Sequence, residues 1–132
     1  MTTVTERALL IDLLAGRVDE LPEVESWSHD RLAQVAADLE LKLGPAAVAE
    51  VIAGYGQGRF PMTSVQTWAS LMRWGFIPGR SGDPIKPIAI EYDELHESAI
   101  VEALSRLTEL GDAIDGELRP GESAELVAAL RD

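Results

Sequence analysis

The sequence predicts a mainly α-helical protein, a single-domain irregular bundle of about six helices over residues 1–132, and three observations favour this fold class. Apolar residues recur at helical spacings of three and four along most of the chain. Glycine and proline interrupt these stretches at intervals of roughly one helix length. Period-two alternation, which is typical of a strand, marks only one short segment near residues 88–92.

The bulk composition is typical of a folded, soluble protein. The 132 residues are 46% apolar and 26% charged, and the chain contains no cysteine. Disulfides, thiolate metal sites and cysteine nucleophiles are therefore excluded. The N-terminal apolar stretch is too short for a membrane span and lacks the basic start of a signal peptide, so a cytoplasmic location is expected. A formal net charge of −12 opposes binding to nucleic-acid backbones and to anionic membranes.

The first helix is expected to begin at a T-x-x-E capping box, formed by Thr3 and Glu6. It should end at Ala15, because Gly16 can take the left-handed conformation that closes a helix. Its leucines and isoleucine leave little polar surface. The helix is therefore expected to be buried on most sides or to meet another chain.

Three segments follow in the N-terminal half. Residues 17–27 are expected to form a connection, because Pro22 interrupts them. Ser28 is placed to cap a helix over residues 29–43, whose apolar side chains fall on one face. A Gly-Pro pair then predicts the end of that helix and the start of the next, over residues 45–53. This third helix is apolar almost all round, as expected in the middle of a bundle.

The next helix carries two tryptophans. Pro61 favours an extended backbone before it, and a second capping box, from Thr63 to Gln66, predicts a helix that reaches Trp74 and closes at Gly75. Trp74 falls on the side opposite the core face and is expected at the surface. The alternative is that Trp74 folds back under Phe76 and Ile77 and only packs there. The residues expected in the core share one face of this helix: Val65, Trp68 and Met72.

The C-terminal part is expected to hold one short strand and two helices. The alternation over 88–92 predicts a strand, or a hairpin between 76–78 and 88–92. Pairing with another molecule, or a role as the start of the following helix, are the alternatives. A long amphipathic helix is predicted over 94–115, and a short final helix over 122–131.

One stretch, residues 54–80, differs from the rest in composition, and we call it the aromatic island. It holds five of the seven aromatic residues, and the wider segment 45–86 carries four basic residues against two acidic ones. The segments on either side are strongly acidic. Because tryptophan and arginine are the residues most enriched in binding hot spots, the aromatic island is the expected binding surface.

The glycines of the aromatic island resemble a phosphate loop only in part. Gly54, Gly56 and Gly58 follow a predicted helix rather than a strand, and no Gly-Lys-Ser/Thr comes after them. A flexible connection is therefore the favoured interpretation. A DNA-binding helix–turn–helix is disfavoured as well, because nine residues separate the two helices that would form it.

Motifs for metal binding and catalysis are incomplete. Asp93, His96 and Glu97 could share a metal ion, but their spacing matches no known type of site. Negative side chains at this position also suit a helix start. No serine lies in a Gly-x-Ser-x-Gly setting, and no carboxylate pair stands in an apolar context. Neither a metal nor a cofactor is expected, and an enzyme is the third choice of function.

We therefore expect a non-enzymatic, acidic protein-interaction module, similar in kind to inhibitors, immunity proteins or viral assembly adaptors. Its partner should be another protein, basic in charge, steered by the acidic face of the helix over 94–115. Membranes and nucleic acid are not expected as partners, and homo-oligomerisation is left open. The residues expected to contact the partner are Tyr55, Arg59, Phe60, Arg73, Trp74, Arg80, Glu102, Glu109 and Asp112. The alternative is a binder of nucleic acid or of an anionic small ligand through Arg59, Arg73 and Arg80.

Overall fold

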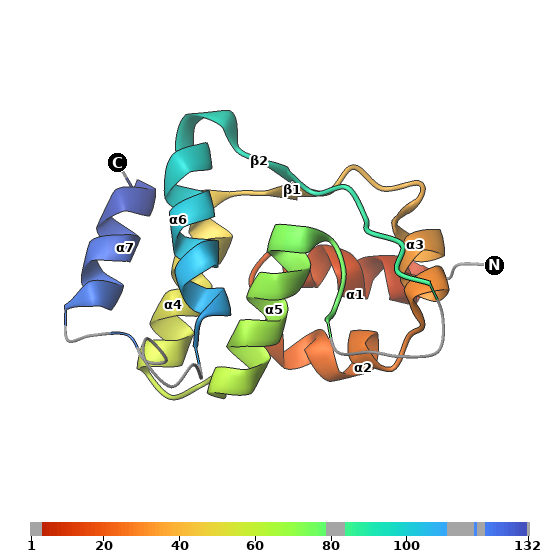
Figure 1. The fold of residues 1–132 in the computed structure, drawn as a ribbon, viewed down its shortest axis with the longest axis horizontal. Coiled ribbons are helices and arrows are strands. Elements are labelled where there is room, and N and C mark those ends of the chain that lie inside the picture. The colour runs from red at the N-terminus through yellow and green to blue at the C-terminus, as the bar shows by residue number, and fades with distance from the viewer. Residues whose placement is uncertain (1–3, 79–83, 111–117, 119–120, 132) are drawn as a thin grey trace.

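The structure, a computed structural model, describes residues 4–78, 84–110, 118 and 121–131. They form an irregular bundle of seven α-helices with a two-stranded sheet (Figure 1), so the predicted fold class is confirmed. The helices are α1 (Val4–Leu14), α2 (Leu21–Glu25), α3 (His29–Ala36), α4 (Pro45–Gly56), α5 (Met62–Trp74), α6 (Glu97–Thr108) and α7 (Glu122–Arg131). The strands are β1 (Lys42–Leu43) and β2 (Glu91–Tyr92), and 3₁₀ turns span Val18–Glu20 and Glu94–His96.

Helix α5 occupies the middle of the molecule. Figure 1 shows α1, α2 and α3 on one side of it and α4, α6 and α7 on the other. The buried side chains form one cluster to which every α-helix contributes. Among the described residues, no helix is long and apolar enough to cross a bilayer.

Two predictions for the N-terminal half are wrong. The expected connection over 17–27 contains a 3₁₀ turn and α2, in which Leu21 and Val24 are buried. The helix expected over 29–43 ends at Ala36, and the chain then extends into β1. The reason lies in the sequence from Leu39 to Leu43, whose alternating leucines fit a strand as well as a helix.

The predicted starts of α3 and α4 are confirmed. The Ser28 side chain accepts a hydrogen bond from the backbone N–H of Arg31, 3.0 Å away, at the start of α3. Helix α4 begins at Pro45 with Gly44 as its N-cap. It runs on through Gly56 instead of ending at residue 53, and Phe60 folds back over Gly54, where a Cβ atom would lie 2.3 Å from the ring.

Helix α5 confirms the predicted core face and corrects the predicted start. Val65, Trp68 and Met72 are buried, and the indole Nε1 of Trp68 donates to the carbonyl of Leu13 at 2.8 Å. The helix begins at Met62, with Pro61 as N-cap, so the capping box expected at Thr63 does not form the start.

The small sheet pairs two segments, β1 and β2, whose pairing was not predicted from the sequence. Strands β1 and β2 run parallel, with Lys42 opposite Glu91 and Leu43 opposite Tyr92. Residues 88–92 therefore do not form a hairpin with 76–78, although the backbone N–H of Ile88 donates to the carbonyl of Gly75 at 2.8 Å. A parallel pair needs a long crossover, which α4 and α5 supply here.

The C-terminal helices lie where they were expected, with one difference. The long helix predicted over 94–115 opens with the 3₁₀ turn Glu94–His96 and continues as α6 to Thr108. Residues 111–117 lie outside the described part of the chain. Helix α7 matches the predicted range, and Leu126 and Leu130 are buried.

Candidate interaction site

The C-terminal end of α5 presents an arginine and a tryptophan at the surface. Gly75 stops the helix with φ +81° and donates its N–H to the carbonyl of Leu71 at 2.8 Å. The last turn before it carries Arg73 and Trp74, and the guanidinium carbon lies 5.0 Å from the centroid of the indole. Trp74 is 43% exposed, whereas Trp68 is 0% exposed. The expectation that Trp74 lies at the surface is confirmed.

Aromatic rings connect this surface to the interior. Phe76 stacks on Trp74, with ring centroids 6.4 Å apart and planes 28° apart. The Phe76 ring also meets His29 edge-on, at 6.4 Å and 73°. Because His29 is only 1% exposed, the ring contacts through Phe76 connect Trp74 to the core. We call Arg73, Trp74 and Phe76 the Trp74 patch.

The geometry of the patch depends on a close approach of the backbone at Gly75. A Cβ atom at this position would lie 2.3 Å from the carbonyl oxygen of Ile88. Glycine is needed both for this contact and for the positive φ. The segment after the patch is held as well, because Lys86 forms an ion pair with Asp30 at the start of α3.

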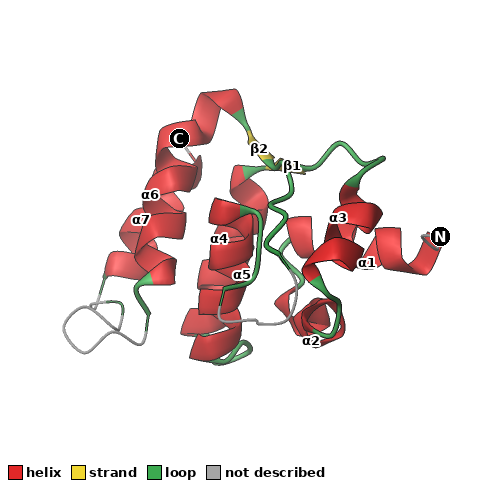
Figure 2. Ribbon diagram, turned by 45° about the vertical axis from the view of Figure 1, so that its right-hand side comes forward, coloured by secondary structure: helices red, strands yellow, loops and turns green. Residues whose placement is uncertain are grey.

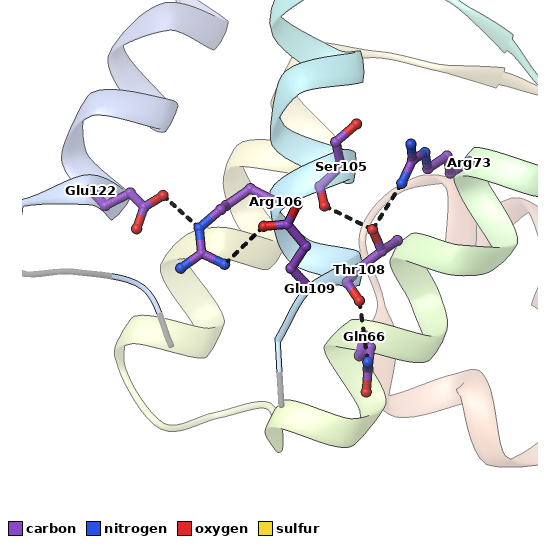
Figure 3. Close-up of polar contacts among 7 residues, drawn as sticks. All are labelled: Gln66, Arg73, Ser105, Arg106, Thr108, Glu109 and Glu122. Atoms are coloured by element: carbon purple, nitrogen blue, oxygen red, sulfur yellow. Dashed lines mark hydrogen bonds and ion pairs between the residues drawn. The ribbon is translucent and has the colours of Figure 1, made fainter. Parts of the chain in front are cut away.

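Arg73 is positioned from α6. Its Nη1 donates to Oγ1 of Thr108 at 3.1 Å, and that hydroxyl donates to the carbonyl of Ser105 at 2.8 Å (Figure 3). Gln66 of α5 donates to the Thr108 carbonyl at 3.2 Å. Arg73 makes no ion pair within the described residues, so its charge is fixed in place without being neutralised. A cation in the last turn also suits the helix dipole.

Tyr92 supports the same turn from behind. Its hydroxyl donates to the carbonyl of Met72 at 2.9 Å. Burial raises the pKa of the Tyr92 hydroxyl, and nearby Glu97 raises it further, while Arg73 opposes the shift. The phenol therefore stays protonated and keeps donating to the helix end at neutral pH.

The other residues expected from the aromatic island lie at the opposite end of α5. Arg59 pairs with Glu50 of α4 at 3.0 Å and lies 5.4 Å from the centroid of the Phe60 ring. Phe60 and Tyr55 are each partly buried and pack against the core. The 13 residues of α5 span about 20 Å, so Arg59 and Arg73 do not share one surface.

Of the three acidic residues expected to steer a partner, the structure describes Glu102 and Glu109. Glu102 is exposed on α6. Glu109 lies 3.6 Å from Nη1 of Arg106, whose Nε also donates to Glu122 of α7 at 2.7 Å (Figure 3). Glu109 is therefore part of a link between α6 and α7. Two further expected residues, Arg80 and Asp112, lie outside the described residues.

Sequence reasoning missed two features, the first of which contacts Phe76 of the Trp74 patch. His29 is buried, and neither ring nitrogen has a hydrogen-bond partner within the described chain. A signal existed, because His29 lies three residues before Leu32 on the apolar face of α3. Ile85 is exposed just before Lys86. Nothing in the sequence marks this isoleucine, which stands between two prolines and belongs to no periodic pattern.

Two of the three residues that were weighed as metal ligands, Asp93 and His96, form a hydrogen-bonded pair. Nδ1 of His96 lies 2.7 Å from Oδ2 of Asp93, and this hydrogen bond is the main reason why the pKa of Asp93 is lowered. Glu97 is exposed on the next turn. Over residues 4–78, 84–110, 118 and 121–131, no three His, Asp or Glu side chains come together as metal ligands do.

The Trp74 patch offers a flat apolar ring, a cation held beside it and a second ring beneath it. Such a surface can take up an apolar or aromatic side chain, and its guanidinium can bind a carboxylate or a carbonyl oxygen. No protein-family model, no curated protein and no solved structure matches the chain.

Proposed function

We propose that this protein is a non-enzymatic interaction module that binds another protein through the Trp74 patch. One observation carries the proposal: Trp74 is 43% exposed although Arg73 and Phe76 hold it at 5.0 and 6.4 Å. A large ring fixed at the surface loses little conformational freedom on binding. Tryptophan and arginine together are the most frequent hot-spot residues at protein interfaces.

The charge of the chain supports a basic partner. The net charge is −12, and Glu102 stands exposed on α6, the helix that also anchors Arg73. Acidic side chains around an apolar anchor speed the encounter with a cationic surface and repel anionic ones. Arg73 then gives the patch a single site for a carboxylate or carbonyl group of the partner.

The separation of the arginines supports a protein partner over a polyanion. A nucleic acid is bound by several cations along its backbone. Here Arg59 is paired with Glu50, and about 20 Å of helix lies between it and Arg73. The Trp74 patch thus contributes one cation, which suits a single contact at a protein interface better than binding along a phosphate backbone.

The proposal is tested by capture from native-cell extract with a photo-crosslinker placed beside the patch. The wild type is expected to capture a protein, and Trp74→Ala is expected to lose it. The matched control is Ile11→Ala, because Ile11 is exposed on α1 at a distance from the patch in sequence. Equal capture by both variants contradicts the proposal, and so does capture of nucleic acid that depends on Arg59 and Arg73.

Kinetics with the purified partner then test the anchoring role. Truncating a hot-spot tryptophan costs about 2 kcal/mol or more of binding free energy. This cost should appear as a dissociation rate raised by about 30-fold, with little change in the association rate. A change confined to association would mean that Trp74 does not hold the bound state.

A further inference from the structure

Helix α7 lies at one end of the molecule and contributes little to the core. Figures 1 and 2 both show it at the outer edge of the bundle, beside α6. Of its 10 residues, Leu126 and Leu130 are buried, whereas α4 and α5 bury six residues each. Most of the surface of α7 therefore faces water.

The attachment of α7 follows a single stripe of side chains. Glu122, Leu126 and Leu130 are spaced four residues apart, so they share one face of the helix. At the start of this stripe, Glu122 accepts a hydrogen bond from Nε of Arg106 on α6 at 2.7 Å (Figure 3). The two leucines supply the buried apolar contact.

The packing of α7 against α4 is incomplete. A groove of about 510 Å³ runs between the two helices, with Leu130 on the α7 side and polar walls at Glu50 and Arg131. The α4 side carries small side chains: Ala46, Ala49 and Ala53. Alanines offer a leucine fewer atoms for contact than larger residues do, so this docking gains less apolar burial than a close-packed one.

The other helices of the bundle also contact one another directly. Helix α6 packs most extensively on α5, and α4 contacts both of them. Helix α7, by contrast, is short. A helix of fewer than about 12 residues is marginal in water by itself, so the helical structure of α7 depends on its docking.

We propose that α7 undocks as a unit and loses its helical structure, while the rest of the described fold stays in place. Undocking exposes Leu126, Leu130 and the side chains of α4 beneath them, whereas complete unfolding exposes the whole buried cluster. An opening that exposes less apolar surface costs less free energy than global unfolding.

The Trp74 patch should remain intact when α7 undocks. The side chains that support it are Phe76 and His29, which stack in sequence behind Trp74, and Thr108, which holds Arg73. All three lie outside α7. The inference thus goes beyond the proposed function and does not rest on it.

Hydrogen exchange followed by mass spectrometry measures the opening. In the wild type, amides of α7 should exchange about 100-fold faster than amides of α5, each relative to its rate in an unstructured chain. Exchange in α7 should also depend less on urea, because the urea dependence scales with the surface that the opening exposes.

Two alanine variants distinguish local opening from global unfolding. Leu21 is 0% exposed in α2, and Figure 1 shows α2 and α7 on opposite sides of α5. Leu21→Ala should speed exchange in α5 about 30-fold and leave α7 unchanged, because α7 opens while the core stays folded. Leu130→Ala should speed exchange in α7 about 30-fold, because it weakens the docking itself.

A charged variant should release α7 completely. Leu126→Asp with Leu130→Asp places two charges on the docking stripe, where burial is costly. Far-UV circular dichroism should lose the signal of the 10 residues of α7, while cooperative urea unfolding and the acrylamide quenching of Trp74 persist. The matched control is Ala124→Asp with Ala128→Asp, which adds the same charges at the same spacing to exposed positions of α7 and should leave it docked.

Equal protection of α7 and α5 in the wild type overturns the inference. So does an exchange rate in α7 that rises together with that of α5 in Leu21→Ala. Complete unfolding of the variant with aspartates at 126 and 130 would make α7 part of the cooperative core, which also overturns it. A folded variant in which Trp74 quenching changes would show that the opening is not local, with the same consequence. None of these measurements involves a partner, so the inference and the proposed function are tested separately.

Discussion

Trp68 and Trp74 are six residues apart on one helix, and the structure predicts very different costs for removing them. Trp68 is 0% exposed and donates its indole N–H to the carbonyl of Leu13 at 2.8 Å. Replacing a buried tryptophan by alanine costs about 3–5 kcal/mol. The lost hydrogen bond adds about 0.5 kcal/mol, the low end of the usual range, because the Leu13 carbonyl still accepts from Gly16 at 3.0 Å.

Trp74→Ala should cost much less. The side chain is 43% exposed, so just over half of an area of about 150–250 Å² is buried. At about 25 cal/mol per Å² this gives an upper bound of about 2–3.5 kcal/mol. The expected cost is about 1–2 kcal/mol, since water fills the vacated space and no internal cavity remains.

Urea denaturation followed by far-UV circular dichroism measures both values. A protein of this size unfolds with a free energy of about 5–15 kcal/mol, so Trp68→Ala should remain folded in water but with a much lower midpoint. Trp68→Phe, which keeps most of the ring, should lose about 1–2 kcal/mol. Acrylamide quenching provides a check, because Trp74 should account for most of the accessible fluorescence. Equal losses for the two alanine variants would refute the assignment of Trp74 to a binding surface.

Three further predictions concern backbone, pH and charge. In thermal unfolding, Gly75→Ala should lower the free energy of unfolding by about 2 kcal/mol or more, because alanine disfavours the positive φ and its Cβ would collide with Ile88. Gly121→Ala is the control and should cost about 1 kcal/mol, because Gly121 has φ +86° but open space around it. Glu20→Gln should raise the melting temperature at pH 7 and leave it unchanged below pH 4.5, the ordinary pKa of the carboxyl. With a basic partner, Glu102→Lys should slow association about two- to tenfold and leave dissociation nearly unchanged in surface plasmon resonance.

The direction of the Glu20 effect follows from proton linkage. Burial, followed by a hydrogen bond and charge repulsion from Asp12, raises the pKa of Glu20 in the folded state. Between the unfolded and the folded pKa the folded protein binds more protons, so stability falls as pH rises through this window. A glutamine has no charge to bury and should remove this slope. A melting temperature that falls in the glutamine variant at pH 7 would contradict the burial of the carboxylate.

The outcomes of the other two experiments are equally direct. If Gly75→Ala and Gly121→Ala lower the free energy of unfolding equally, the close contact between Gly75 and Ile88 does not affect stability. If Glu102→Lys tightens binding, the partner is a polyanion and the proposal of a basic protein fails. Nucleic acid would then be the first candidate to test.

Local chemistry in the sequence predicted two helix ends correctly, although the capping box expected at Thr63 does not start α5. Ser28 caps α3, and Gly75 closes α5. The position of Trp74 opposite the core face followed from the helical period alone. These features depend on residues within one or two turns of each other, which is the range over which a sequence pattern is informative.

The missed features depend on contacts between distant parts of the chain. The pairing of Lys42 with Glu91 leaves no local trace, because any two extended segments can form it. The same limit applies to the aromatic island. Arg59 and Arg73 are close in sequence and alike in type, yet the rigid length of α5 places them at opposite ends.

The position of α5 explains why one end of the aromatic island became part of the core and the other did not. Its N-terminal end follows a tight turn in which Phe60 covers Gly54, so those aromatic side chains serve packing. Its C-terminal end is stopped by Gly75, which has a positive φ and lies too close to the Ile88 carbonyl to carry a side chain. Trp74 stays 43% exposed after this turn, while Phe76 and His29 connect it to the interior. A ring held so firmly yet left uncovered has already lost most of the entropy that binding would remove, and this favours recognition over packing as its role.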